Sequence, residues 1–326
     1  MEITRGSARS GKILTDSEAA CKPGTLPASQ TIGETEFTLH MSTHMILVFS
    51  CPDQPGIVAS VSAFIADVGG NILESSQFGD AQTGRFFMRT EFSVAAQGKP
   101  GAETLRRGFE PVAAHFGMSW QLCPSGDRMR VVIAVSRWGH CFNALLNNWR
   151  AGVLPIEIVA AVSNHDDLRA VSEWYGVPFH YLPVTPETRA QQEQAILHIM
   201  RDSNADLLVL ARYMQILSDD LCHHLKGRAI NIHHSFLPGF KGARPYHQAH
   251  ARGVKLIGAT AHYVTSDLDE GPIIDQDVER VTHAHQPEDL VMIGRDRENA
   301  VLGRAVLWHA QHRVLLNGRR TVVFGR

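Results

Sequence analysis

Two stretches late in the sequence combine residue types suited to acid–base chemistry and to stabilising an oxyanion. Asn231 and His233 stand two positions apart at the end of an apolar run, and a later loop carries the carboxylates Asp267, Asp269 and Glu270. Because side chains alternate along a strand, Asn231 and His233 should project from one face. A nearby carboxylate raises the pKa of an imidazole and holds one tautomer. The pattern predicts a site built from an amide, a histidine and one carboxylate.

Each of these residues also has a plainer interpretation when taken alone. A single Asn or His at the end of a strand is more often a hydrogen-bonded core group, and acidic residues in a loop are often solvated surface charges. The combination, in which each stretch directly follows an apolar strand, favours catalysis. The residues alone do not choose among the three carboxylates.

The elements that must position these residues alternate between strand and helix. Apolar runs predict strands at 130–135, 156–162, 178–182, 207–211, 228–233 and 258–264, and helical spacing predicts helices at 141–151, 165–175, 186–203 and 219–225. Strands that are apolar on both faces indicate a mostly parallel sheet with helices on both sides, a Rossmann-like α/β domain over 124–326. Ligands of such sheets bind beyond the carboxyl ends of the strands, where both stretches lie.

The preceding segment has a different pattern, which predicts a separate α+β domain over residues 41–123. Strands are expected at 44–50, 71–78, 85–94 and 118–122, and helices at 57–68 and 102–116. This β-α-β-β-α-β order is the ferredoxin-like arrangement. Residues 1–40 have no sustained periodicity and are interpreted as a flexible N-terminal extension.

Composition limits the classes of function. The 326 residues suit two domains, and a net charge of −2 is unlike the basic footprint of a nucleic-acid binder. No apolar run approaches the roughly 20 residues of a membrane span, and the start lacks a signal core, so no membrane association and a cytoplasmic location are expected. The five cysteines form no C-x-x-C pair, and the 18 histidines include no H-E-x-x-H motif. Reduced thiols and no protein-bound metal are therefore expected.

The stretch 231–276 resembles the folate-dependent formyltransferase fold shared with glycinamide ribonucleotide transformylase and methionyl-tRNA formyltransferase. That family carries Asn-x-His and a downstream Asp in an L-D-x-G-P loop, which by position implies Asn231, His233 and Asp269 as the catalytic residues. The resemblance also implies two walls of a folate site, formed by Leu210, Tyr213, Met214, Gln215 and Ile216 and, opposite them, by His262 and Val264.

Within that fold, the double histidine at 233–234 and the closing stretch 314–324 resemble the formyltetrahydrofolate deformylases. Asn317-Gly318 in the closing stretch predicts a tight hairpin turn. The resemblance implies a hydrolase that converts 10-formyltetrahydrofolate to tetrahydrofolate and formate, supplies formate for purine synthesis and holds no permanent cofactor. We weighed two alternatives: a formyltransferase with a small amine acceptor, and a folate-binding sensor without turnover.

The loop after the first strand of the second domain bears on the choice of acceptor. It contains Ser136, Trp138 and His140, whereas the amine-using relatives that the sequence resembles have a small, Gly-rich loop there. A phosphate cradle requires glycine because backbone N–H groups must approach the ligand. We expect this loop to fill or reshape the acceptor side, so that only water reaches the formyl carbon.

The first domain resembles an ACT domain at the turn before its first helix and at its second strand. The resemblance implies a small amino acid, glycine or methionine, at Asp53, Gly56, Asn71 and Ile72, and a homo-oligomer, either dimer or tetramer. Free N–H groups at a helix N-terminus suit a ligand carboxylate. The plainer interpretation is that Asp53 caps this helix.

Overall fold

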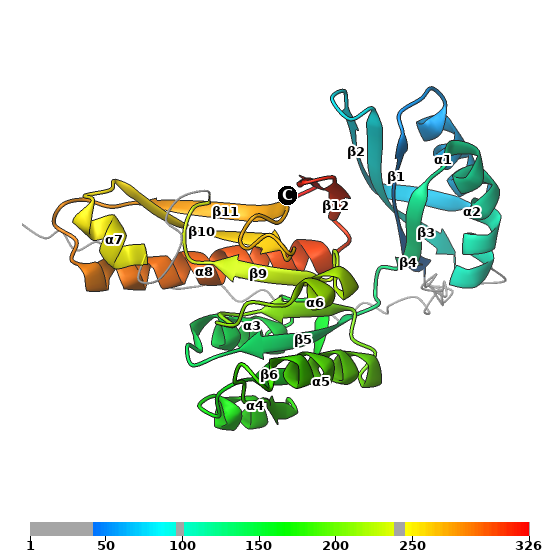
Figure 1. Ribbon diagram of the computed structural model, residues 1–326. Helices are drawn as coiled ribbons and strands as arrows, with labels where there is room; N and C mark the ends of the chain where they lie inside the picture. The colour runs from blue at the N-terminus through cyan, green and yellow to red at the C-terminus, as the bar shows by residue number, and fades with distance from the viewer. Residues whose placement is uncertain (1–41, 96–100, 238–244, 326) are drawn as a thin grey trace, which may run out of the picture. The chain divides into compact units, whose positions relative to one another are not determined.

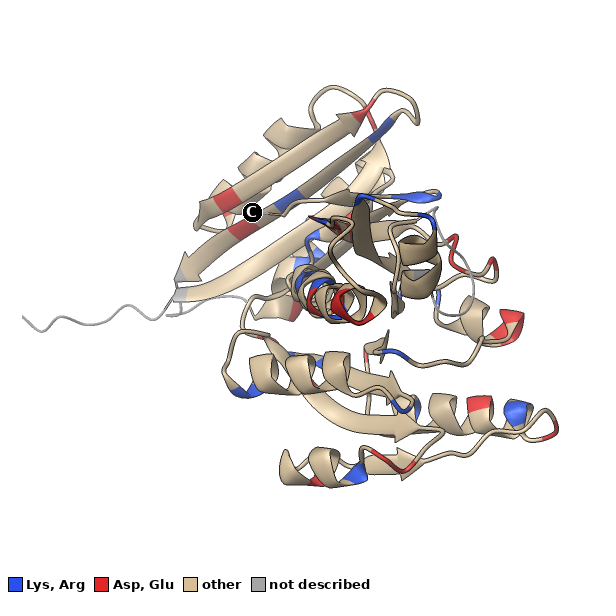
Figure 2. Ribbon diagram, turned by 90° about the vertical axis from the view of Figure 1, so that its left-hand side faces the viewer, with Lys and Arg blue, Asp and Glu red and all other residues tan. Residues whose placement is uncertain are grey.

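The computed structural model describes residues 42–95, 101–237 and 245–325. The predicted N-terminal extension at 1–40 lies outside the described residues. In the view of Figure 2, basic and acidic positions are interspersed over the helices and strands. None of the described helices is long and apolar enough to cross a membrane.

The first part of the described chain is a four-stranded sheet with two helices on one face (Figure 1). The elements follow the predicted order: β1 (Ser42–Pro52), α1 (Ile57–Asp67), β2 (Gly70–Asp80), β3 (Arg85–Ala95), α2 (Ala102–Phe116) and β4 (Ser119–Pro124). The strands lie in the order β2-β3-β1-β4, with antiparallel pairs throughout. Phe49, Phe64 and Phe109 fill the space between the sheet and the helices.

The beginning of α1 differs from the plainer interpretation of its sequence. The residue that caps the helix is Gly56, with φ of 94°, and no side chain makes a capping hydrogen bond. The interpretation of Asp53 as the helix cap is therefore wrong. Glycine is suited to this position because a left-handed backbone costs it no steric penalty.

The second part is built on a seven-stranded sheet in the order β11-β10-β9-β8-β5-β6-β7. Its strands are β5 (Met129–Val135), β6 (Ile156–Ser163), β7 (Phe179–Tyr181), β8 (Leu207–Leu210), β9 (Ala229–His233), β10 (Leu256–Tyr263) and β11 (Ile273–Arg280). Strands β5 to β9 are parallel, and β10 and β11 join the edge antiparallel. The chain places β6 and β7 on one side of β5 and then crosses to β8 on the other side, so the strand order reverses between β5 and β8.

Helices cover both faces of this sheet, as the two-sided apolar strands predict. They are α3 (His140–Arg150), α4 (Arg169–Trp174), α5 (Arg189–Asp202), α6 (Asp219–His224), α7 (Pro245–Ala251) and α8 (Pro287–Ala310). One core lies between the sheet, α3 and α8, and another lies between the sheet, α5 and α6. The predicted fold class, a ferredoxin-like domain followed by a mostly parallel α/β domain, is confirmed.

Three elements were not predicted, namely α7, α8 and β11, whereas the hairpin near the end was. The long helix α8 buries Gly294 and the charged Glu298 along with its apolar residues, so it lacks a clean amphipathic stripe. The strand β11 carries Asp275 and Asp277 within its apolar run. The predicted hairpin is confirmed: β12 (Val314–Asn317) and β13 (Arg320–Val323) pair across Gly318, whose φ is 63°.

The core beneath α3 predicts a large stability effect for one substitution. Phe142 is fully buried there, so Phe142→Ala should lower the unfolding free energy by about 3–5 kcal/mol through lost burial and an unfilled cavity. Urea unfolding followed by circular dichroism measures this. Met292→Ala, at a side chain that is 60% exposed on α8, is the control and should change stability by no more than about 0.5 kcal/mol. Equal midpoints for the two variants would contradict the assignment of this core.

Candidate active site

The structure brings Asn231, His233 and Asp269 together and adds His262 to them. The Nδ1 atom of His233 lies 3.2 Å from Oδ1 of Asp269, and Nε2 of His262 lies 3.7 Å from the same oxygen. The amide nitrogen of Asn231 lies 3.2 Å from Nε2 of His262. One carboxylate therefore faces two imidazoles, and one of these imidazoles contacts the amide.

Strand pairing explains how residues so far apart in sequence meet. Asn231 and His233 lie at the carboxyl end of β9, and β10 runs antiparallel beside it with His262 opposite Asn231. The chain then leaves β10, passes through Asp269 and returns as β11. The backbone of Asp269 is left-handed, with φ of 58°, a conformation that Asp tolerates better than most residues.

The same geometry separates Asp269 from the two other carboxylates of its loop. Asp267 is exposed, and Glu270 lies 3.4 Å from the guanidinium of Arg319. Asp269 is the carboxylate that lies beside His233, with Oδ1 3.2 Å from Nδ1 of the ring. The choice that the sequence left open between the carboxylates is thus made by the loop conformation.

The hydrogen bonds assign roles to the ring nitrogens. The Nδ1 atom of His262 lies 2.9 Å from the carbonyl oxygen of Tyr263, which can only accept, so Nδ1 carries a proton. In the neutral ring Nε2 then accepts from the amide of Asn231, which holds that amide with its second N–H free for another acceptor.

Asp269 and His233 form the charged part of the site. Burial by itself raises the pKa of Asp269, but hydrogen bonding to His233, and to His262 when that ring is protonated, together with the positive charge of the protonated rings, lowers it well below its ordinary value. The carboxylate therefore stays ionised and accepts from Nδ1 of His233. The opposite nitrogen of that ring, Nε2, is buried and has no hydrogen-bond partner among the described residues. A buried polar atom without a partner is uncommon in native proteins and indicates a place for a ligand atom.

The predicted folate-lining residues separate into buried and exposed groups. Leu210 and Tyr213 belong to the core between the sheet and α5, where the Tyr213 hydroxyl accepts from Gln192. Met214 and Ile216 are 54% and 60% exposed on the loop after β8. The remaining predicted residues, Gln215 on that loop and Val264 after β10, are partly buried.

The predicted acceptor-side loop is tied to the loop after β8. The Ser136 hydroxyl donates to Asn164 at 2.7 Å and accepts the backbone N–H of Met214 at 3.0 Å. Trp138 is 53% exposed, with the guanidinium of Arg295 5.2 Å from the centre of its ring.

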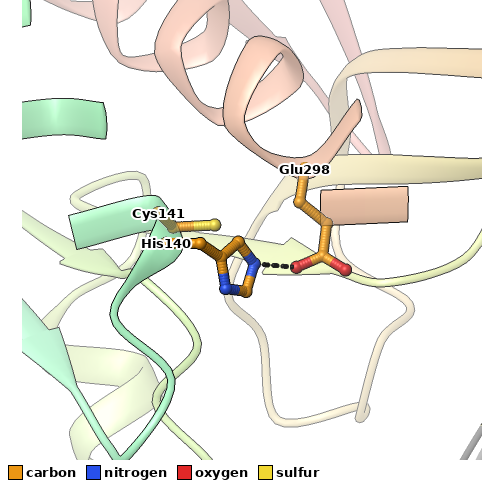
Figure 3. A group of neighbouring side chains, drawn as sticks. All are labelled: His140, Cys141 and Glu298. Atoms are coloured by element: carbon orange, nitrogen blue, oxygen red, sulfur yellow. Dashed lines mark hydrogen bonds and ion pairs between the residues drawn. The ribbon is translucent and has the colours of Figure 1, made fainter. Parts of the chain in front are cut away.

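His140 leads to a cluster that the sequence analysis missed. Its Nε2 lies 2.7 Å from the buried carboxylate of Glu298, and the thiol of Cys141 lies alongside (Figure 3). Tyr246 and Arg212 also contact Glu298. One feature of the sequence could have indicated this cluster. Glu298 follows Gly294 by four residues, which places both on one face of a helix over 287–310.

The predicted effector residues of the first domain do not form one site within a chain. Asp53 lies beside Gly79, near the far end of β2, because a Cβ on Gly79 would lie 3.1 Å from the Asp53 carboxylate. Asn71 and Ile72 lie at the beginning of that strand. Eight residues of strand separate Asn71 from Gly79, a distance of about 26 Å.

Comparison with known proteins identifies the class and then the family. Residues 44–106 match the ACT domain family and residues 129–306 match the formyl transferase family, so the chain is an ACT domain joined to a formyl transferase domain. It is 50% identical to a formyltetrahydrofolate deformylase of Corynebacterium sp. (strain P-1) over 85% of this chain and 97% of that one. The crystal structure of a formyltetrahydrofolate deformylase from Burkholderia mallei superposes with a TM-score of 0.83 at 49% identity, covering 87% of this chain and all of that one. The chain belongs to the formyltetrahydrofolate deformylase family, and the resemblance seen in the sequence is confirmed.

A more distant relative shares only the second domain. Glycinamide ribonucleotide transformylase 1 from Symbiobacterium toebii is 28% identical, with a TM-score of 0.57, and covers 61% of this chain and 95% of that one. The same sheet thus supports enzymes whose names specify an amine-bearing acceptor.

The loop that carries Asp269 predicts a severe effect for one small substitution. A Cβ on Gly271 would lie 1.7 Å from the carbonyl oxygen of Tyr263, a backbone atom that cannot move aside cheaply. Gly271→Ala should therefore displace the loop that carries Asp269 and lower turnover by roughly 100-fold or more, since misplacing a catalytic group by about 1 Å has that effect. Steady-state turnover of the purified variant measures this. Gly253→Ala, where a Cβ would meet nothing within 4 Å although φ is 62°, is the control for a strained glycine outside the site. Equal activities would show that the loop has room to adapt.

Proposed function

We propose that this chain hydrolyses 10-formyltetrahydrofolate to tetrahydrofolate and formate, with Asn231, His233 and Asp269 as its catalytic residues. The observation that carries the proposal is the unpartnered, buried Nε2 of His233 beside the amide of Asn231, with an ionised Asp269 behind the ring. These groups supply what hydrolysis of a formyl amide needs: a donor for the oxyanion and a group that moves a proton.

The reaction can be written through these groups. Water attacks the formyl carbon, and the free N–H of Asn231 donates to the oxygen that becomes negative. The bond between the formyl carbon and N10 then breaks, and N10 leaves as the amine with one proton of the water, which His233 carries to it. The carbon departs as formic acid, which ionises to formate and releases the second proton to solvent. Asp269 holds the imidazole in one tautomer and stabilises its charged form.

Covalent catalysis has no support among the described residues. Burial raises the pKa of Cys141, so its thiol stays protonated, and only a thiolate is a good nucleophile. Direct attack by water needs no such group.

We assign the folate to the side of the site next to the loop after β8. The exposed side chains of Met214 and Ile216 offer apolar surface for a pterin ring. His262 serves the site from its opposite side through Asn231 and Asp269. The buried Leu210 and Tyr213 support this loop from beneath.

Substitution of Asp269, Asn231 and the neighbouring Asp267 tests the catalytic assignment. Asp269→Ala should lower the rate of formate release by roughly 10²–10⁴, the usual contribution of general acid–base groups. Asn231→Ala should lower it by roughly 10²–10³, the cost of one oxyanion donor. Asp267→Ala, in the same loop but outside the site, should retain activity. The measurement is formate produced from 10-formyltetrahydrofolate with no amine added. Undiminished turnover in Asp269→Ala would exclude the assignment, and no formate from the parent chain would exclude the function.

The ACT domain, we further propose, binds a small amino acid, glycine or methionine, between two copies of the chain. The distance of about 26 Å between Asn71 and the end of β2 next to Asp53 means that one chain cannot supply both to one ligand. An antiparallel arrangement of two copies, with β2 beside β2, would bring Asn71 of one next to Asp53 of the other. The proposal therefore requires a homo-oligomer, at least a dimer.

Mixing two variants tests the shared effector site. Asp53→Ala and Asn71→Ala should each abolish binding of the amino acid in calorimetry. A mixture refolded or co-expressed at equal amounts should recover roughly a quarter of the sites, because half of the dimers are mixed and each of these has one intact site. Arg107→Ala, at an exposed position on α2, is the control and should bind normally. A mixture that binds no better than either variant would contradict the shared site.

A further inference from the structure

Three polar side chains from three separate segments meet at the buried carboxylate of Glu298, which is 1% exposed. His140 lies 2.7 Å from its Oε2, and the Tyr246 hydroxyl donates to its Oε1 at 2.8 Å. The Nε atom of Arg212 lies 3.5 Å from Oε2. Both carboxylate oxygens therefore contact polar groups of the protein itself, and Figure 3 shows the contact with His140.

The place of this cluster in the fold is where a ligand is ordinarily found. Open α/β sheets bind ligands beyond the carboxyl ends of the strands, at the point where the strand order reverses. In this sheet the reversal falls between β5 and β8. His140 follows the loop after β5, and Arg212 follows β8. Glu298 reaches them from α8 and joins the two sides of that crevice.

The two loops are held together at a second point, and one of them is strained. The Ser136 hydroxyl links the loop after β5 to the N–H of Met214. Arg212 has φ of 64°, a left-handed conformation that a residue other than glycine keeps only where its surroundings hold it. The ion pair with Glu298 is the contact that holds its side chain.

The cluster continues to the catalytic histidine through ring contacts. The Tyr246 ring packs over Gly294, where a Cβ would lie 2.1 Å from it. Its centre lies 6.4 Å from that of His234, and His234 stacks on His233 with ring centres 4.9 Å apart. Two rings, those of Tyr246 and His234, thus lie between Glu298 and His233. The crevice between the loops after β5 and β8 therefore lies next to the candidate catalytic histidine.

A metal ion is the competing occupant, because ligand atoms of His140, Cys141 and Glu298 lie within 4.8 Å of one another. The charges argue against it. The guanidinium of Arg212 already neutralises the carboxylate and would repel a cation, and burial raises the pKa of the Cys141 thiol, which would have to lose its proton to bind.

We propose that Glu298 is a built-in carboxylate ligand that closes the crevice between β5 and β8, and that it determines specificity by excluding an amine acceptor and leaving water as the acceptor of the formyl group. The inference rests on the proposed hydrolysis. Arg212 and the ring N of His140 are donors suited to the carboxylate of a second substrate, and Glu298 occupies their place. Glu298 touches no reacting atom, so its role is one of positioning and exclusion.

Removal of this carboxylate should open a second reaction with a defined balance. In that reaction an amine nitrogen forms a bond to the formyl carbon, the bond from that carbon to N10 breaks, and the proton of the amine passes to N10. Glycine is the probe acceptor because its carboxylate can take the place of the Glu298 carboxylate. Glycinamide, which has no carboxylate, is the matched probe.

The test compares the parent chain with Glu298→Ala at mildly alkaline pH, where more of each amine is unprotonated. Formate and N-formyl products from 10-formyltetrahydrofolate are measured together. The ratio of formylglycine to formate should rise roughly 10-fold or more in Glu298→Ala, the usual scale of losing one charged contact, with a smaller rise for glycinamide. A purely structural role would lower both products together and leave their ratio unchanged.

Two further variants keep the result interpretable. Arg304→Ala removes an ion pair with Asp275 elsewhere on α8 and should leave the ratio unchanged, which excludes a general loosening of the helix. If Glu298→Ala does not fold, Glu298→Gln removes the charge but keeps the size of the side chain, and should raise the same ratio by a smaller factor. A folded variant that releases formate without formylglycine would overturn the inference, as would stoichiometric zinc that disappears in Glu298→Ala. Absence of formate from the parent chain would instead overturn the proposed hydrolysis.

Discussion

A carboxylate that stays ionised below the surface is the constraint around which the edge of the sheet with the candidate site is arranged. Asp269 is partly removed from water, which disfavours its charge, and two imidazoles restore the balance. Those imidazoles are supplied by adjacent strands of opposite direction. The antiparallel pairing of β10 with β9 is therefore what makes the site: it sets His262 beside Asn231 and lets the following loop return to His233.

The same physical problem is solved a second time at Glu298, with a different result. There the carboxylate is compensated by an arginine, a histidine and a tyrosine, and no polar atom of Glu298 is left over. At Asp269 the compensation leaves one buried imidazole nitrogen without a partner. A completely satisfied carboxylate suits a closed wall, whereas an unpartnered atom suits a place where substrate binds.

The contrast between the Asp269 site and the Glu298 cluster bears on the comparison with the glycinamide ribonucleotide transformylase of Symbiobacterium toebii. The two proteins share the fold of the second domain, with a TM-score of 0.57. Under the proposal made for Glu298, the acceptor is selected by the loops and by the helix that packs against them. In this chain those parts are bound to one another by Ser136 and Glu298, which contact groups from the loops after β5 and β8.

The sequence by itself determined the alternation of strands and helices, the two kinds of domain, the common face of Asn231 and His233, and the turn at Gly318, because each depends on local periodicity or on a residue's own backbone preference. The resemblance to the formyltransferase family selected Asp269 over Asp267 and Glu270, and the geometry then placed Asp269 beside His233. Only the tertiary structure decided that His262 joins the site, that Asp267 and Glu270 face elsewhere, and that Glu298 is buried. These depend on pairing between β9 and β10 and on contacts of α8 with loops more than 80 residues away. No local pattern encodes such contacts, since the same letters would suit an exposed helix or loop equally well.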